Sequence, residues 1–220
     1  MKSPLSLAID ASTYRGTVAV ISGDQVLAAA EVAMRGEREE RLMPAVAAAL
    51  RDAGIAVPDL TRVVVGAGPG SFTSLRIGVA IAKGICTAAH LPLAAVPSLA
   101  LLVAGTEHAM DDGQYLVVLD AMRGDMHAAL VESNAGFVTA ILPLGLVPRP
   151  DVASLAAKHG ATVVGLGEPV DAVPHARGVA RVEASLVHDV ALDSWEPAYG
   201  RLAEAQVKWE AEHGRPLTTG

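Results

Sequence analysis

Two aspartates with hydroxyl neighbours are the residues best suited to catalysis in this sequence. Asp10 ends a short apolar stretch and is followed by Ser12 and Thr13, and Asp120 ends a second apolar stretch. Carboxylates at the ends of strands lie where α/β sheets bind ligands, so the pair could hold Mg²⁺ with a nucleotide. Each aspartate could instead cap a turn. The sequence alone leaves both interpretations open.

A glycine-rich segment, Gly-Ala-Gly-Pro-Gly-Ser-Phe-Thr over residues 66–73, lies between a buried strand and the start of a helix. Such a turn presents backbone N–H groups and the positive end of a helix, so Gly68, Gly70 and Ser71 are candidates for an anion-binding turn. It is not a P-loop, because no Gly-Lys-Ser/Thr follows it. The alternative is a tight strand-to-helix connection in which Ser71 or Thr73 caps the helix.

The sequence gives little support for a metal site or a reactive thiol. The seven histidines include no pair at i, i+4 on one helix, so the common helical metal-ligand pair is missing and no metal site is predicted. Cys86 is the only cysteine, which excludes a disulfide within the chain. Its neighbours Ile85, Ala88 and Ala89 favour an inert thiol in the core.

Composition narrows the function classes. The 220 residues are 51% hydrophobic and 19% charged, enough to bury a sizeable core. The net charge is −7, with 9 basic and 9 acidic residues in 1–110 and 8 and 15 in 111–220. A free-standing nucleic-acid binder needs a basic face, which neither half provides. No 18-residue apolar run and no signal-peptide core occur, so we expect a cytoplasmic protein without a membrane partner.

Hydrophobic periodicity predicts an α/β chain that opens with an antiparallel meander. Strands are predicted over 5–9, 17–22, 25–33, 61–67, 93–96, 115–119, 126–132, 137–142 and 162–166. Helices are predicted over 37–53, 73–90, from Ser98, over 183–193 and over 202–213. Pro44 should lie in the first turns of its helix or make a kink. A strand, an aspartate and a hairpin occur at Asp10 and again at Asp120, which suggests a duplicated lobe.

The two helices of the first half carry an interface signal. Residues 72–84 are apolar nearly all round, so this helix should be covered on both sides. Gly78 and Ala82 would allow a close approach by another helix. The helix over 37–53 adds Leu42 and Met43 beside a charged rim. An oligomer interface and ordinary packing within the chain explain this pattern equally well.

Several segments together resemble the TsaB (YeaZ) family. They are Leu-Ala-Ile-Asp-Ala-Ser-Thr at 7–13, Arg-Leu-Met-Pro at 41–44, Gly-Pro-Gly-Ser-Phe-Thr-Ser-Leu-Arg-Ile-Gly at 68–78, Pro-Leu-Ala-Ala-Val-Pro-Ser-Leu at 92–99 and Asp-Ala-Met-Arg-Gly-Asp at 120–125. The resemblance implies an α/β, actin-like ATPase (ASKHA) fold of two ribonuclease-H-like lobes. The expected lobes are residues 1–110, with partner-docking helices, and a smaller lobe over 111–220.

The resemblance also implies a function. It is that of a non-catalytic scaffold and dimerisation subunit that binds TsaD, with TsaE, for N6-threonylcarbamoylation of the tRNA adenosine next to the anticodon. The chain alone would form a homodimer, tRNA would be met only through the complex, and no cofactor is expected beyond weak ATP, ADP or Mg²⁺ binding. The implied interface comprises Arg38, Leu42, Met43, Phe72, Leu75, Arg76 and Val79.

On this reading Asp10, Ser12, Thr13 and Asp120 are a vestigial nucleotide site. The alternative is an enzyme, an actin-fold phosphotransferase or ATPase that uses Asp10 and Asp120. A third reading, a metallopeptidase, is disfavoured by the spacing of the histidines.

Overall fold

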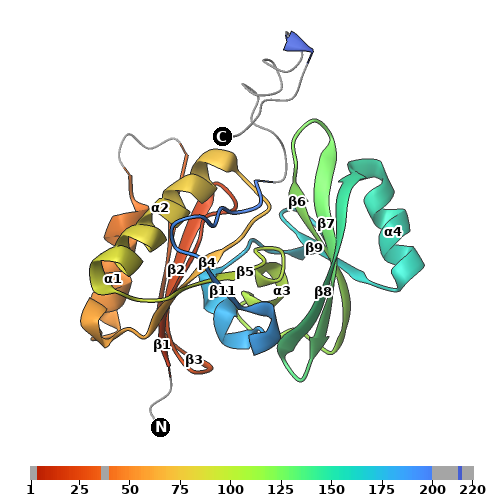
Figure 1. Cartoon of the computed structure of the whole chain (residues 1–220). Helices are drawn as coiled ribbons and strands as arrows, with labels where there is room; N and C mark the ends of the chain where they lie inside the picture. The colour runs from red at the N-terminus through yellow and green to blue at the C-terminus, as the bar shows by residue number, and fades with distance from the viewer. Residues whose placement is uncertain (1–3, 36–39, 200–212, 215–220) are drawn as a thin grey trace.

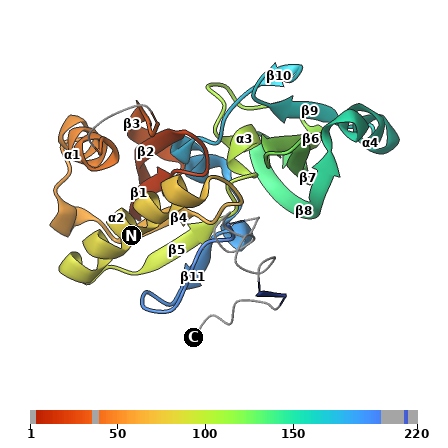
Figure 2. The same ribbon diagram turned by 90° about the horizontal axis from the view of Figure 1, so that it is seen from above.

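The strands of the computed structural model form two sheets that lie side by side (Figures 1 and 2). The model describes residues 4–35, 40–199 and 213–214. The first sheet has the strand order β11-β5-β4-β1-β2-β3, and the second has the order β10-β9-β6-β7-β8. The structure is therefore α/β with mixed sheets, as the hydrophobic pattern predicts.

The first sheet begins as an antiparallel meander of β1 (Leu5–Asp10), β2 (Arg15–Ser22) and β3 (Gln25–Ala33). The tight turn before β3 holds Gly23 at a φ of 62°, a conformation that glycine adopts without a steric penalty. The strands β4 (Arg62–Gly66) and β5 (Leu93–Val96) then extend the sheet in parallel on the other side of β1.

The second sheet repeats this plan. The strands β6 (Gly113–Asp120), β7 (Asp125–Asn134) and β8 (Phe137–Pro148) form an antiparallel meander. The strands β9 (Thr162–Gly165) and β10 (Val170–Asp171) add to β6 in parallel. The matching order of directions supports the duplication that the repeated strand-aspartate-hairpin pattern predicts.

The helices and sheets alternate in layers. The helices α1 (Leu42–Asp52) and α2 (Phe72–Ala89) cover the outer face of the first sheet, and α4 (Val152–His159) covers the outer face of the second (Figure 1). Between the sheets lie α3 (Leu101–Ala104) and the 3-10 helix η3 (Ala176–Arg181). Three hydrophobic cores fill these layers, and side-chain alternation along central strands such as β1 and β6 divides their residues between two of them.

Local chemistry explains where α1 and α2 begin and end. The Glu40 carboxylate accepts the free N–H groups of Leu42 and Met43 at the start of α1. Pro44 lies in the first turn, as predicted, where it removes no helical hydrogen bond. The α2 helix ends at His90, which adopts the left-handed conformation typical of a helix C-cap.

Several segments after residue 97 differ from the sequence predictions. The helix predicted over 183–193 is wrong: this segment forms the short 3-10 helix η4 (Ala184–Leu186) and the strand β11 (His188–Val190), which pairs with β5. The helix predicted from Ser98 is only α3, and α4 was not predicted. The helix predicted over 202–213 falls almost wholly outside the described residues. Because β11 joins the first sheet, residues 111–220 do not all belong to the second.

Candidate functional site

An apolar depression lies between α1 and α2. A groove of about 390 Å³ lies here, lined by Met43, Val57, Ile81, Gly84, Ile85 and Ala88. We call this feature the α1–α2 groove. Its lining contains no charged side chain, and Val57 belongs to the short 3-10 helix η1 (Val57–Asp59) that follows α1. An uncharged depression between two helices offers shape and hydrophobic contact, which are what a protein partner requires at the centre of an interface.

Part of the apolar surface of α2 is exposed to solvent. Among the described residues it alone has the length and composition of a membrane-crossing helix, with a mean hydropathy of 1.3. Core helices share these properties, and one side of α2 does pack on the first sheet. Only 39% of the helix is buried, however, so apolar groups such as Ala80, Gly84 and Ala88 remain exposed. Within the described part of the chain, this face of α2 is therefore exposed.

The residues predicted for the interface divide into two groups. Leu42, Leu75 and Val79 are buried, with exposed fractions of 0%, 1% and 8%, so these side chains belong to the interior and are unavailable to a partner. Their apolar spacing reflects packing on the sheet. Met43 and Phe72 are exposed, at 45% and 36%, and Arg76 is also at the surface. Arg38 lies outside the described residues.

An aromatic cluster extends the surface at the start of α2. The rings of Phe72 and Tyr199 lie 4.6 Å apart between centroids, and the Arg76 guanidinium lies 5.3 Å from the centre of the Phe72 ring. Burial raises the pKa of Tyr199. Aromatic residues and arginine are the types most often found at the energetic centres of interfaces.

The chain segment after β11 fastens this cluster to α2. The Lys83 ammonium donates to the Trp195 carbonyl at 2.7 Å, and the Ala198 N–H donates to the Ala67 carbonyl at 2.8 Å. Sequence reasoning assigned no site role to Trp195, Tyr199 or Gly84. These contacts join segments more than 100 residues apart, and no local pattern reports them.

The glycine-rich turn is closed by neighbouring chain segments. The Gly68 N–H donates to the Ser98 hydroxyl at 3.0 Å, and the Ser71 N–H donates to the Ser12 carbonyl at 2.7 Å. A Cβ at Gly70 would collide with the Ser12 carbonyl, so this glycine permits a close approach of two backbones. The protein itself takes up two of the donors of this turn, and anion binding at Gly68, Gly70 and Ser71 stays a prediction. The segment is a tight strand-to-helix connection with Ser71 at the N-cap position, but its hydroxyl contacts the Ser74 hydroxyl and makes no capping hydrogen bond.

Asp10 joins three segments of the chain. Its exposed fraction is 0%. One carboxylate oxygen accepts from the N–H and hydroxyl of Ser12 at 3.0 and 2.7 Å, and the other accepts from the Ser98 hydroxyl at 2.6 Å. Burial raises the pKa of Asp10, while these three hydrogen bonds act in the opposite direction. Both oxygens thus bind protein donors, which suits a structural hub.

Of the other members of the predicted nucleotide site, Ser12 binds Asp10, whereas Thr13 and Asp120 make other contacts. Asp120 is exposed, and its carboxylate accepts the Met122 N–H at 2.8 Å within its own turn. Strand alternation places Asp120 on the α4 face with Leu116 and Val118, whereas Asp10 shares the inter-sheet face of its own strand. The Thr13 hydroxyl bonds to the backbone of Arg15. Within the described residues, no three His, Cys, Asp or Glu side chains are grouped to hold a metal.

Two meanders continued by parallel strands, packed through a shared core, define the α/β fold of the actin-like ATPase class. Residues 31–140 match the family model described as TsaD: tRNA N6-adenosine threonylcarbamoyltransferase. The Bacillus subtilis tRNA threonylcarbamoyladenosine biosynthesis protein TsaB is 31% identical over 228 aligned positions, 92% of this chain and 96% of that one. The chain belongs to the TsaB (YeaZ) family.

Other similar proteins agree with this assignment. The Escherichia coli protein of the same name is 34% identical over 56% of this chain and 53% of its own. A Pseudomonas aeruginosa structure described as similar to the peptidase YEAZ has a TM-score of 0.71 at 21% identity, covering 90% of this chain and 100% of that one. A structure of YeaZ from Pseudomonas aeruginosa has a TM-score of 0.63 at 21% identity, over 80% and 88%. These two structures share the fold.

Proposed function

We propose that this chain is a non-catalytic scaffold subunit in the biosynthesis of threonylcarbamoyladenosine in tRNA. Family membership and the names of the Bacillus subtilis and Escherichia coli relatives support a role in this pathway. The finer proposal is that the chain docks TsaD through α1 and α2, that TsaE joins the pair, and that the free chain forms a homodimer through the same face. The protein would act in the cytoplasm and meet tRNA only within the complex.

The observation that carries the docking proposal is the exposed apolar side of α2, with Ala80, Gly84 and Ala88. The α1–α2 groove brings residues of α1, η1 and α2 to one surface, and the Phe72–Tyr199–Arg76 cluster lies at the N-terminal end of α2. Exposing such a surface is unfavourable in water, and a protein partner that covers it gains the hydrophobic contribution of its burial. A related actin-like chain could present two equivalent helices to this groove, which is why we favour one surface for both TsaD and self-association.

The non-catalytic part of the proposal is supported by Asp10. A nucleotide-dependent enzyme of this fold would need this carboxylate free to act on Mg²⁺ or water at the inter-lobe cleft. Here both oxygens are bound to Ser12 and Ser98, and Asp120 lies on a different sheet face. The alternative phosphotransferase therefore receives less support from the geometry. Weak binding of ATP, ADP or Mg²⁺ stays a prediction, to be measured by calorimetry.

An omission assay tests the proposal. Unmodified tRNA, the activated threonylcarbamoyl donor, ATP, TsaD and TsaE are incubated with and without this chain, and modified adenosine is measured by mass spectrometry. We expect product only when the chain is present, and none from the chain with tRNA and donor alone. Equal product without the chain would refute the scaffold role. Product from the chain without TsaD would show that it is itself the enzyme.

Asp10→Asn provides a matched variant for the same assay. A scaffold should keep at least half of its stimulating activity at a temperature where the variant is folded, because the carboxylate touches no substrate. An enzyme that uses Asp10 as a general base or metal ligand should lose about a hundredfold or more. A loss of that size with an unchanged thermal midpoint would favour the phosphotransferase.

A further inference from the structure

Arg76 lies on the exposed stripe of α2 that leads to the α1–α2 groove. Arg76, Ala80 and Gly84 follow one another at intervals of four residues, and all three are exposed. Side chains at this spacing lie on one face of a helix, and the three residues span only about 12 Å along its axis. A protein that covers Gly84 and follows the helix therefore also covers Arg76, and must accommodate its charge.

The hydrogen-bond donors of Arg76 are unused in the described part of the chain. Its guanidinium lies 5.3 Å from the centre of the Phe72 ring, and no hydrogen bond or ion pair joins it to another described residue. A cation held over a ring is attracted to the π electrons, so this contact leaves the N–H groups free. Arg76 thus presents a planar fork of donors, the geometry that matches a carboxylate.

Aromatic neighbours hold this fork in place. Phe72 contacts the ring of Tyr199, with 4.6 Å between the centroids and 50° between the ring planes. Hydrogen bonds from Lys83 and Ala198 in turn hold the segment around Tyr199 against α2. A side chain that is already in position loses less conformational entropy when it binds a partner. Arg76 is therefore prepared for a specific contact.

The charges of the two helices favour a different protein over a second copy of this chain. The α2 helix carries two cations, Arg76 and Lys83, and no acidic residue. The one acidic residue of α1, Asp52, is paired with Arg51 at 3.7 Å. Two copies that meet through these helices would bring like charges together, which lowers affinity. Glu196 lies beside Tyr199 and could reach Arg76 of a second copy, so self-association is the competing outcome of the test.

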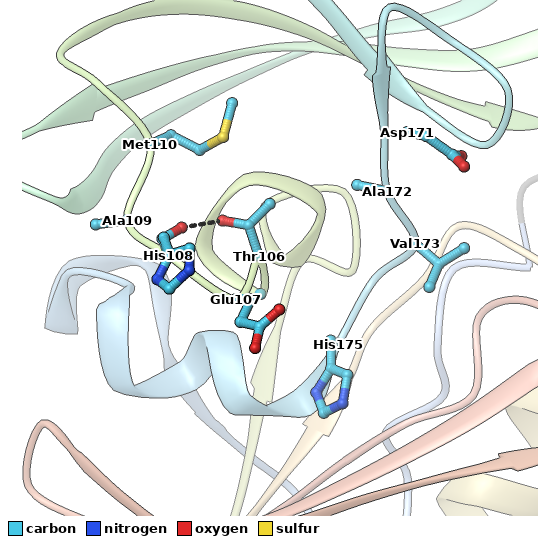
Figure 3. Close-up of a pocket in the computed structure, with 10 residues that line it drawn as sticks. Thr106, Glu107, His108, Ala109, Met110, Asp171, Ala172, Val173 and His175 are labelled. Carbon is cyan, nitrogen blue, oxygen red and sulfur yellow. Dashed lines mark hydrogen bonds between the residues drawn. The ribbon is translucent and has the colours of Figure 1, made fainter.

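A second depression of the surface has the opposite charge. It has a volume of about 420 Å³ between the segments that follow α3 and β10, and the carboxylates of Glu107 and Asp171 line it (Figure 3). An acidic surface of a partner is repelled there and attracted to α2, although the whole chain carries a net charge of −7. The charge distribution thus distinguishes one face of the molecule from the other.

We propose that Arg76 is a specificity-determining residue of the docking surface, where its guanidinium binds an aspartate or glutamate carboxylate of the partner protein. This inference rests on the proposed function, in which TsaD docks on α1 and α2. The uncharged groove would supply hydrophobic contact to any apolar surface. The bidentate contact of Arg76 would select a partner that carries a carboxylate, in preference to a second copy of this chain.

Calorimetry with TsaD tests the role of the guanidinium. Arg76→Met keeps the apolar stem and should lower the affinity by at least about tenfold, whereas Arg76→Lys keeps the charge without the fork and should lower it less. Raising the sodium chloride concentration should weaken binding of the wild type more than that of Arg76→Met. Lys158→Met removes an exposed cation from α4 and should bind like the wild type. Because Arg76 is exposed, its variants should keep a thermal midpoint within about 2 °C of the wild type.

Tyr199 is expected to act as a positioning residue through Phe72. Tyr199→Ala should lower the affinity for TsaD by about threefold and make it less sensitive to salt, because the guanidinium is held less firmly. Tyr199→Phe retains the ring and should restore both the affinity and the salt dependence. A loss with Tyr199→Ala at unchanged salt dependence would show that Tyr199 does not act through Arg76.

Sedimentation velocity of the free chain distinguishes TsaD from a second copy. Arg76→Met should not weaken self-association, because it removes a like charge from the contact. Equal weakening of self-association and of TsaD binding would overturn the proposal, and so would an affinity of Arg76→Met for TsaD within about threefold of the wild type.

Gly84→Arg separates this proposal from the proposed function on which it rests. If Gly84→Arg still binds TsaD like the wild type, the docking surface itself is wrong, and the role of Arg76 falls with it. If Gly84→Arg loses TsaD while Arg76→Met binds it fully, the docking surface stands and only the role of Arg76 is refuted. Loss of binding by both variants, with Lys158→Met unaffected, is the result that we expect.

Discussion

Replacing Gly84 with arginine should separate partner docking from folding. Gly84 is exposed in α2 and lines the α1–α2 groove, and a Cβ built on it meets no atom within 4 Å. The isolated chain therefore has room for the new side chain. Arginine is favoured over glycine inside a helix by about 0.7 kcal/mol. For a chain of this size we expect the thermal midpoint to rise by about 2 °C.

The same Gly84→Arg substitution should lower the affinity for a docking partner. The groove residues supply no acceptor for a guanidinium, so a partner that covers the groove would bury an unpaired charge. Such a charge costs about 3–5 kcal/mol in a sealed contact, and the long arginine stem can relieve part of this by reaching the rim. The lower value already corresponds to a loss of affinity of at least about a hundredfold. A substitution that stabilises the fold would thus abolish the assembly.

Three measurements check this reasoning. Differential scanning fluorimetry gives the midpoint, sedimentation velocity gives self-association, and calorimetry gives the affinity for TsaD. Gly84→Ala controls for helix propensity and should raise the midpoint while largely retaining docking. Ala157→Arg, on the exposed side of α4, controls for the added charge and should leave docking unchanged. If Gly84→Arg binds TsaD and itself within threefold of the wild type, the groove is not the docking surface.

Three further predictions concern the interior. Burial lowers the pKa of His175 from its usual 6.5 to about 4, so between pH 6.5 and 4 the unfolded chain binds a proton that the folded chain does not. The free energy of unfolding should therefore fall by roughly 3 kcal/mol as the pH drops from 6.5 to 4. Urea titrations of His175→Asn should show a flatter pH dependence. Ser98→Ala should lower the free energy of unfolding by about 2–4 kcal/mol, because it leaves one carboxylate oxygen of Asp10 and the Gly68 N–H without a partner. A loss below about 0.5 kcal/mol in urea titrations, roughly the scatter of surface substitutions, would contradict the hub. Burial raises the pKa of Cys86 to about 11, so a thiol reagent should modify the chain only after unfolding, and rapid labelling of the native protein would disprove this.

The sequence predicted the elements that have strong local signals. The hairpin of β2 and β3 has a Gly-Asp turn between alternating residues, and α2 has a continuous apolar pattern that ends at His90. The segment with β11 was assigned to a helix because its pairing with β5 joins residues about 95 positions apart, which local periodicity does not report. The α4 helix also has a local signal, an apolar helical period that ends at Gly160, although no helix was predicted there.

The candidate site was predictable only in outline. Apolar spacing identified α1 and α2 as unusual helices, but it did not tell which of their residues face the sheet. Leu75 and Val79 face inward, whereas the small residues Gly84 and Ala88 form the surface. A charge placed at Leu75 would therefore test folding rather than docking. The glycine-rich turn was recognised, but its occupation by Ser12 and Ser98 depends on contacts between distant segments.

Because β11 pairs with β5, the first sheet is completed only late in the synthesis of the chain. The β5 edge is available as soon as residue 96 has left the ribosome, yet its partner β11 follows only at residues 188–190. Over the intervening stretch the nascent chain exposes an unpaired strand edge while the whole second sheet is being made. Slow translation between these two points would lengthen that exposure and increase misassembly, whereas slow translation after residue 190 would not.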